Sequence, residues 1–173
     1  MRPTDITAEV VGRDNSRNHA ICSPRRLFKH RVTGVATTPN YHTMYVNVQQ
    51  SVLLFRKTAA AAAAFKRVSR PDVARCFADY VHREAAIRAG TSIGSVTRQA
   101  LIVEPVGEQS ISYRLSVPIP QNEAAVDVLF NRIGRALSGV ALVWRVPSQD
   151  LELQEALVVH LATRVRQALT ARG

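Results

Sequence analysis

The fold of this chain is decided by the stretch VLLFRKTAAAAAAFKRVSRPDVARC, residues 52–76. The apolar run that ends at Phe55 has the composition of a buried strand. Thr58, a suitable N-cap, then opens a run of six alanines, which have high helix propensity and let a helix lie close on a sheet. Pro71 suits the first turn of a second helix, where its missing N–H is not needed. The stretch therefore predicts a strand followed by two helices.

Two of the predicted helices have recognisable ends. The second helix is expected to run from Pro71 to Gly90, a natural helix stop. Its apolar face consists of Val73, Cys76, Phe77, Tyr80 and Ala85, which recur at helical spacing. A closing helix is expected to begin at Ser148, its N-cap, and the residues that line it are Leu153, Leu157, Leu161, Val165 and Leu169.

The rest of the chain is predicted to form strands. Strand-like patterns cover residues 44–55, 96–103, 110–117, 126–130 and 136–144. The last four have connections too short for parallel crossovers, so we expect an antiparallel meander. The predicted class is α+β, with an antiparallel sheet of about five strands packed by the alanine-rich helix, the second helix and the C-terminal helix. One domain is expected at 21–173, after a flexible lead-in at 1–20.

Composition and charge narrow the classes of protein to which this chain can belong. Hydrophobic residues make up 46% of the chain, enough for a core, which excludes a disordered tail. The net charge of +10 lies entirely in residues 1–98, which hold 16 Lys/Arg and 6 Asp/Glu, whereas residues 99–173 hold 7 of each kind. No apolar run reaches the roughly 18 residues that a bilayer crossing needs, and the start of the chain lacks the apolar core of a signal peptide. The protein is therefore expected to be cytosolic, or exported from a longer precursor.

A strongly basic surface attracts nucleic acid, anionic lipid head groups or acidic cell-wall polymers. The alternative is that these charges are solvated and only keep the protein soluble. The preferred anion-binding residues are Arg25, Arg26, Lys29 and Arg31, with Phe28 among them to stack on a base or sugar. A second basic set surrounds the alanine helix and consists of Arg56, Lys57, Lys66, Arg67 and Arg70. No recognised nucleic-acid-binding motif accompanies either set.

Cys22 and Cys76 are the only cysteines. They lack the CxxC spacing and the four Cys or His ligands of a structural zinc site, so no metal is expected. They are either two buried thiols or one disulfide, and a disulfide requires an oxidising compartment. A bridge would tie the N-terminal segment to the second helix and close a loop of roughly 55 residues.

Residues 90–94, GTSIG, match the G-x-S-x-G pattern in which Ser92 would be a nucleophile. That motif needs a strand before the serine and a helix after it, whereas the order predicted here is a helix and then a strand. A helix-to-strand turn is therefore the preferred interpretation. The five histidines are scattered without catalytic or ligand spacing, and no phosphate-binding glycine loop is present, so no cofactor is expected.

The order of a strand ending VLLFR, the helix AAAAAAF and the segment RPDVARCF resembles actinobacterial secreted or lipid-anchored sensor-like domains, including the PknH-like extracellular domain family. The later strings SISYRLSVP, VDVLFNRIGRALSGVALVW and LELQEALVVHLATRVRQAL resemble the same group, so the resemblance covers roughly residues 20–170. It implies an antiparallel sheet packed by helices, often with disulfides, a cleft that binds a ligand, and no enzyme activity. Better-known members have four cysteines, whereas this chain has two.

We therefore expect a non-enzymatic, extracytoplasmic, sensor-like domain that is secreted, or anchored to a membrane through a segment absent from this sequence. Its expected partner is a small molecule or an anionic component of the cell envelope. The first alternative is a cytosolic protein that binds nucleic acid or another polyanion. The second alternative is a small serine hydrolase that acts through Ser92.

Overall fold

The computed structural model describes residues 32–37, 41–42, 46–90, 92–119, 122–144 and 151–170. The elements follow in the order β1 (Val32–Thr37), β2 (Tyr41–His42), β3 (Val46–Phe55), α2 (Thr58–Val68), α3 (Pro71–Ala89), β4 (Thr97–Ala100), β5 (Gln109–Ile119), β6 (Asn122–Ile133), β7 (Ala136–Trp144) and α4 (Leu151–Thr170). The predicted α+β class is confirmed.

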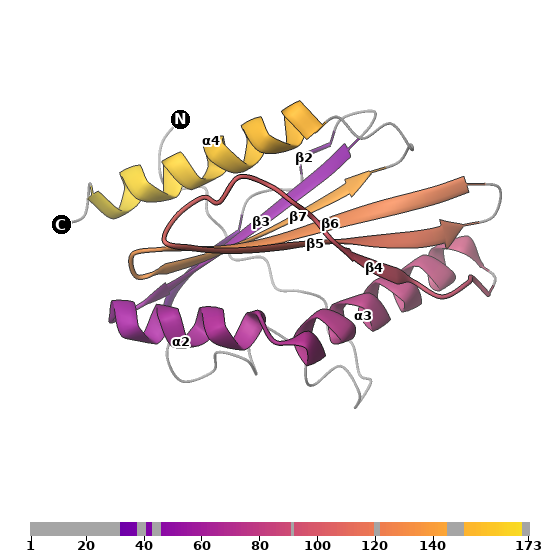
Figure 1. Ribbon diagram of the computed structural model, residues 1–173, viewed down its shortest axis with the longest axis horizontal. Coiled ribbons are helices and arrows are strands. Elements are labelled where there is room, and N and C mark those ends of the chain that lie inside the picture. The colour runs from indigo at the N-terminus through magenta and orange to yellow at the C-terminus, as the bar shows by residue number, and fades with distance from the viewer. Residues whose placement is uncertain are drawn as a thin grey trace.

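All the strands belong to one seven-stranded antiparallel sheet. Its order is β1-β3-β7-β6-β5-β4, and β2 pairs with β3 beside β1. The last four strands are neighbours in sequence order, so the predicted meander is confirmed. Figure 1 shows α4 over one face of the sheet and α2 and α3 over the other face.

Because successive strand residues point to opposite faces, each long strand contributes to two separate cores. On β7, for example, Leu137 packs in the core beneath α2 and α3, whereas Leu142 and Trp144 pack in the core beneath α4. Phe55 at the end of β3 and Leu115 on β5 are fully buried in the first core. Both faces of the sheet are therefore apolar, and helices on both sides are needed to keep them from water.

The alanine run forms α2 as predicted, and its small side chains bring the helix close to the sheet. Ala61, Ala64 and Phe65 are buried against the first core. The N-cap is Lys57 and not Thr58, so the predicted cap is wrong by one residue. The reason is that the extended backbone of Lys57 already places its carbonyl to accept the Ala61 N–H.

Helix α3 begins at Pro71, and Gly90 ends it with a left-handed φ of 63°, as predicted. The face that packs in the first core differs from the prediction and consists of Ala74, Phe77, Ala78, Val81 and Ala85. Val73, at the start of the helix, is buried as well. Tyr80 is 43% exposed, and Cys76 is half-buried outside this stripe. Apolar periodicity alone did not distinguish these two residues from the packed ones.

Several strand boundaries differ from the prediction. β4 ends at Ala100 because residues 101–106 leave the sheet, and Ile102 there is 94% exposed. β1 and β2 were not predicted, which is why the sheet exceeds the expected size. The lead-in at 1–20 and the expected cap Ser148 lie outside the described residues.

Candidate functional site

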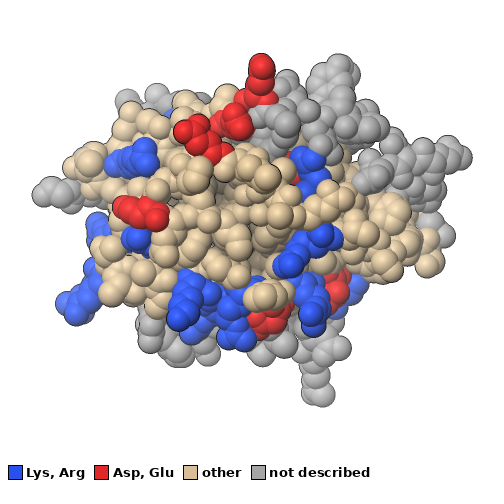
Figure 2. Space-filling view, in the orientation of Figure 1, with Lys and Arg blue, Asp and Glu red and all other residues tan. Residues whose placement is uncertain are grey.

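Basic side chains gather on the side of the molecule that α2 and α3 cover (Figure 2). Arg56 and Lys57 precede α2 and Lys66 and Arg67 lie in its last turn, and all four are exposed. The helix itself contains no acidic residue. We call these four residues the α2 basic band. A surface that carries these four positive charges can attract an anion. This role was predicted from the sequence for the basic residues around the alanine helix.

Arg70, the fifth member of that predicted set, is paired. Its Nε and Nη2 donate to the two carboxylate oxygens of Asp72 at 3.0 and 2.9 Å. Both side chains are more than half exposed, at 63% and 52%. Because such a surface pair contributes little to stability and already neutralises its own charge, Arg70 is not counted in the α2 basic band.

The other predicted anion-binding residues, Arg25, Arg26, Lys29 and Arg31, lie outside the described residues, so their role stays a prediction. Cys22 lies outside them as well. Cys76, the cysteine in the described part, is half-buried on α3 and is not a free thiol. The pairing of the two cysteines stays a prediction.

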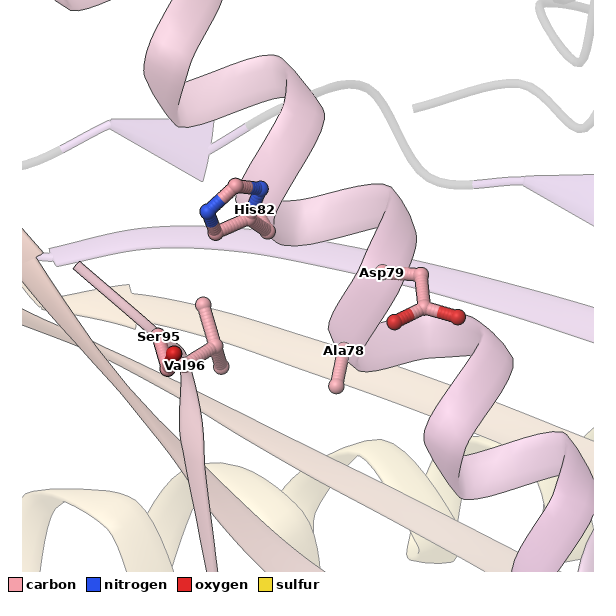
Figure 3. A pocket seen from close by; sticks show the side chains of 5 residues that line it. All are labelled: Ala78, Asp79, His82, Ser95 and Val96. Atoms are coloured by element: carbon pink, nitrogen blue, oxygen red, sulfur yellow. The ribbon is translucent and has the colours of Figure 1, made fainter. Parts of the chain in front are cut away.

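A pocket of about 270 Å³ lies between α3 and the segment that leads into β4. Ala78 and Val96 are its apolar residues, and Asp79, His82 and Ser95 are its polar ones. Figure 3 shows His82 and Asp79 on α3 with Ser95 on the other side of the pocket, and the Asp79 carboxylate is not turned toward the His82 ring. A Ser-His-Asp relay needs the acid to hold the histidine that serves the serine, so these side chains do not form one.

Ser92 is exposed and lies after the end of α3 and before the start of β4. The chain order around it is helix and then strand, which is the reverse of the order in a nucleophile elbow. The structure therefore gives no geometric support to Ser92 as a nucleophile.

A buried polar cluster on the α4 face was not predicted. Nε and Nη2 of Arg114 donate to the two oxygens of Asp127 at 2.6 and 2.7 Å, and Trp144 Nε1 donates to the same carboxylate at 2.6 Å. Asp127 is completely buried and the Arg114 side chain is 11% exposed. The cluster joins β5, β6 and β7, and its burial makes it a structural rather than a ligand-binding feature. A lone arginine and a lone aspartate inside apolar strands are the sequence signal that could have identified it.

Tyr113 lies on the opposite face of β5 from this cluster and is 4% exposed. Its hydroxyl has no hydrogen-bond partner among the described residues. Burial raises the pKa of this phenol above its ordinary value of 10, and the positive charge of Arg98 offsets only part of that rise. Tyr113 therefore stays neutral at physiological pH.

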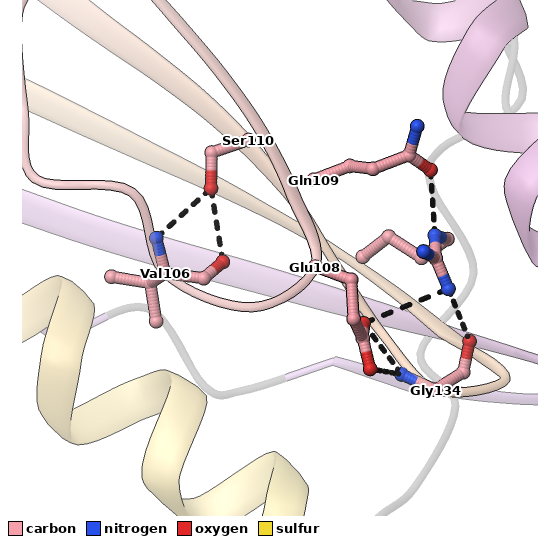
Figure 4. Close-up of polar contacts among 6 residues, drawn as sticks. Val106, Glu108, Gln109, Ser110 and Gly134 are labelled. Carbon is pink, nitrogen blue, oxygen red and sulfur yellow. Dashed lines mark hydrogen bonds and ion pairs between the residues drawn. The ribbon is translucent and has the colours of Figure 1, made fainter.

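The turns at one end of the sheet are joined by the polar contacts that Figure 4 shows. Both carboxylate oxygens of Glu108 accept the Gly134 N–H, at 3.0 and 2.9 Å, and Arg132 Nη1 lies 3.6 Å from the same carboxylate. Ser110 Oγ accepts the Val106 N–H at 3.0 Å. These contacts fix the segment that follows β4 to the β6–β7 turn.

None of the helices in the described ranges combines the length and hydrophobicity that a membrane crossing requires. The same ranges contain no group of three or more His, Cys, Asp or Glu side chains that could hold a metal ion.

The fold and the α2 basic band together define an antiparallel α+β domain with a cationic side. No protein-family model matches the chain, and no curated protein matches it in sequence. The crystal structure of the extracellular domain of PknH from Mycobacterium tuberculosis is similar to it, with a TM-score of 0.47 and 9% identity, over 81% of this chain and 70% of that chain. A likeness of this degree carries no information on what this chain binds.

Proposed function

We propose that this chain is a non-enzymatic, extracytoplasmic ligand-binding domain that binds an anionic component of the cell envelope. The observation that carries the proposal is the α2 basic band, which places four exposed cations around a helix without an acidic residue. Such a surface raises the local concentration of anions and steers them toward the protein. The sensor-like role and the kinship with the PknH-like family are part of this proposal.

The extracytoplasmic location is supported by Cys76, which is not a free thiol. Disulfides persist in oxidising compartments and are rare in a reducing cytosol. Alkylation of the protein from its native source, under denaturing conditions and before any reductant is added, tests this part of the proposal. Resistance of both cysteines to alkylation is expected, and immediate alkylation of both would favour the cytosolic, nucleic-acid-binding alternative.

The binding surface is tested with Arg56→Glu/Lys57→Glu. Acidic residues at a helix N-terminus interact favourably with the helix dipole, so this variant removes cations without weakening α2. The matched control is Arg164→Glu/Arg166→Glu, which makes the same charge change at exposed positions of α4 on the other face of the sheet.

Inorganic polyphosphate is the probe, with phosphatidylglycerol vesicles and duplex DNA as comparisons. Lost phosphate contacts lower affinity steeply, so we expect the α2 variant to bind polyphosphate about tenfold more weakly and the α4 control to keep most of its affinity. Equal effects of the two variants would show that net charge alone determines binding. Preferential binding of DNA at physiological salt would favour the nucleic-acid alternative.

A further inference from the structure

The sheet has an open edge at β4. In the described part of the chain β4 is the last strand in the sheet order, and it pairs with β5 on one side only. All the residues of β4 are exposed. An edge strand of this kind presents unpaired backbone groups to any chain that can align with it. β4 is therefore available for pairing with another strand.

The backbone groups that point outward follow from the pairing with β5. The Leu101 N–H donates to the carbonyl oxygen of Ser112 at 3.4 Å, in the register that continues the β4–β5 ladder. Backbone groups of successive strand residues point to alternate sides, so those of Gln99 and Leu101 face β5. The N–H and C=O groups of Arg98 and Ala100 consequently point away from the sheet, where no described strand lies.

The opposite edge of the sheet is less regular. There β1 pairs with β3 in a register that shifts between Val32 and Gly34. Such irregularities are one way in which proteins protect an edge from further pairing. The register of β4 with β5 is continuous, and β4 contains neither proline nor lysine. Of these two edges, β4 is therefore better suited to accept a strand.

We propose that β4 pairs with β4 of a second copy of this chain, antiparallel and around a twofold axis, to form a homodimer with one continuous sheet. The register centres on Gln99, which lies opposite Gln99 of the second copy. Arg98 then lies opposite Ala100 of the second copy. The outward N–H and C=O groups of these two residues face each other, so the pair exchanges both of its backbone hydrogen bonds. This inference does not depend on the proposed function.

Charge and strand length select this register. A pairing centred on Arg98 would place the two arginines directly opposite each other on the same face, and like charges in that position are destabilising. A centre at Thr97 or at Ala100 would pair Arg98 with a residue outside β4. The centre at Gln99 avoids both problems, because each guanidinium lies beside the small side chain of an alanine.

Exposed apolar surface favours the same register. Ile102, two residues after β4, is 94% exposed although its side chain is large and hydrophobic. In the register centred on Gln99, Ile102 extends toward Val96 of the second copy, the residue that precedes β4 there. The twofold axis repeats this contact, so the pairing removes apolar surface from water in two places.

The twofold axis is perpendicular to the sheet, so each face of the sheet keeps its own side. Both copies of α2 and α3 therefore lie on one side of the joined sheet and both copies of α4 on the other, in the layers that Figure 1 shows for one copy. Exposed Arg56 and Lys57 of the two copies share a side, and an anion long enough to reach both pairs would gain avidity. A contact of the same patch with itself closes as a dimer.

Sedimentation velocity from micromolar to millimolar protein tests the dimer. One short strand per copy makes a small interface, so a monomer–dimer equilibrium is expected in this range. Ala100→Pro removes an outward N–H from each copy while the bonds from β4 to β5 stay intact. We expect it to raise the Kd of the dimer about tenfold or more, because two interchain hydrogen bonds are lost. The matched control Ala100→Ser keeps the N–H and should dimerise as the wild type does.

Disulfide trapping with a mild oxidant reads the register directly. In Gln99→Cys the two Cα atoms face each other at about 4.5 Å, within reach of a disulfide. In the control Thr97→Cys they lie at least about 13 Å apart, because the two residues are offset by four positions. We expect a dimer that reductant dissociates in the first variant and no such dimer in the second.

Several results would overturn the inference. A monomer at millimolar concentration, or equal trapping of the two cysteine variants, would do so. Unchanged dimerisation of Ala100→Pro, with a native circular dichroism spectrum, would show that the β4 edge is not the interface. Assemblies larger than a dimer would indicate pairing of β4 with β1 of the next copy and refute the twofold contact. If Ala100→Pro does not fold, the cysteine variants decide, because both substitutions are at exposed positions.

Discussion

Asp127 has no exposed surface and accepts hydrogen bonds from Arg114 and Trp144. Replacing it with alanine deprives a buried guanidinium of its carboxylate. Breaking a buried pair in this way typically costs about 3–5 kcal/mol, because the remaining charge stays desolvated. We expect Asp127→Ala to lower the free energy of unfolding by this amount, measured by urea denaturation monitored through Trp144, the only tryptophan.

The matched control is Asp72→Ala, which breaks the exposed pair with Arg70. An exposed ion pair contributes about 0–1 kcal/mol to stability. This variant should therefore unfold at a urea concentration close to the wild-type midpoint. If the two alanine variants were equally stable, burial would not determine the contribution of these carboxylates.

At Tyr113 the structure predicts a pH dependence. The unfolded phenol ionises near pH 10, whereas burial raises the pKa of the folded phenol above that value. Above pH 10 the unfolded state therefore binds fewer protons than the folded state, and stability falls as pH rises. Below pH 10 the contribution of the neutral phenol is fully present.

The variant Tyr113→Phe should remove this dependence. We expect the wild-type free energy of unfolding to fall more steeply than that of the variant between pH 10 and 11, by up to about 1.4 kcal/mol per pH unit. At pH 7 the two proteins should have similar stability, because the hydroxyl has no hydrogen-bond partner among the described residues. Parallel pH profiles would mean that Tyr113 ionises normally in the folded state.

Among the connecting segments, the turn before β5 depends on Gly107. Its φ is +95°, and a Cβ at this position would clash with the carbonyl oxygen of Arg132. Gly90, at the end of α3, also has a positive φ of +63°, but a Cβ there would meet nothing within 4 Å. The two glycines separate the cost of left-handed backbone from the cost of a steric clash.

We expect Gly90→Ala to destabilise the protein by about 1–2 kcal/mol, the cost of a left-handed conformation. Gly107→Ala should cost distinctly more, because the backbone of Arg132 must also move. Thermal unfolding of the two variants measures the difference. Equal losses would show that the contact with Arg132 relaxes without penalty.

The helices and strands that could be predicted from the sequence are those whose hydrophobic residues are also the buried ones. Helix α2 and strand β7 were predicted because alanine propensity and a continuous apolar run coincide with burial on the sheet. β4 was predicted to be too long because Leu101, Ile102 and Val103 are apolar, although Ile102 is almost fully exposed. β1 was not predicted because Gly34 interrupts the strand-like pattern of its six residues. These residues are partly buried because they pair with β3, which the local sequence does not show.

The exposure of the cations around α2 could be predicted from the sequence, whereas their role in binding an anion stays a prediction. Arg56, Lys57, Lys66 and Arg67 were identified because exposed cations around a helix follow from its apolar inner face. Whether they share a surface with the cluster at 25–31 is a tertiary question that no local pattern answers. The ion pair of Arg114 and Asp127 likewise depends on strand register, which places the two residues directly opposite each other.

For the whole molecule, the predicted bridge between Cys22 and Cys76 has a thermodynamic consequence. A Cys22–Cys76 disulfide closes a loop of roughly 55 residues, which corresponds to about 4 kcal/mol in the chain-entropy model. We expect Cys22→Ser/Cys76→Ser to lower the free energy of unfolding by about this amount in urea. That loss is large for a domain of this size. Binding experiments on this variant should therefore be done well below its thermal unfolding midpoint, where the protein is still folded.

The single variants show whether these two cysteines form one bond. Either serine abolishes the same bridge, so Cys22→Ser and Cys76→Ser should each be as destabilising as the double variant, a complete failure of additivity. In Cys22→Ser the thiol of Cys76 should in addition become available to alkylation in urea. If Cys76→Ser alone were destabilising and Cys22→Ser behaved as wild type, the stabilising contact of Cys76 would not be with Cys22.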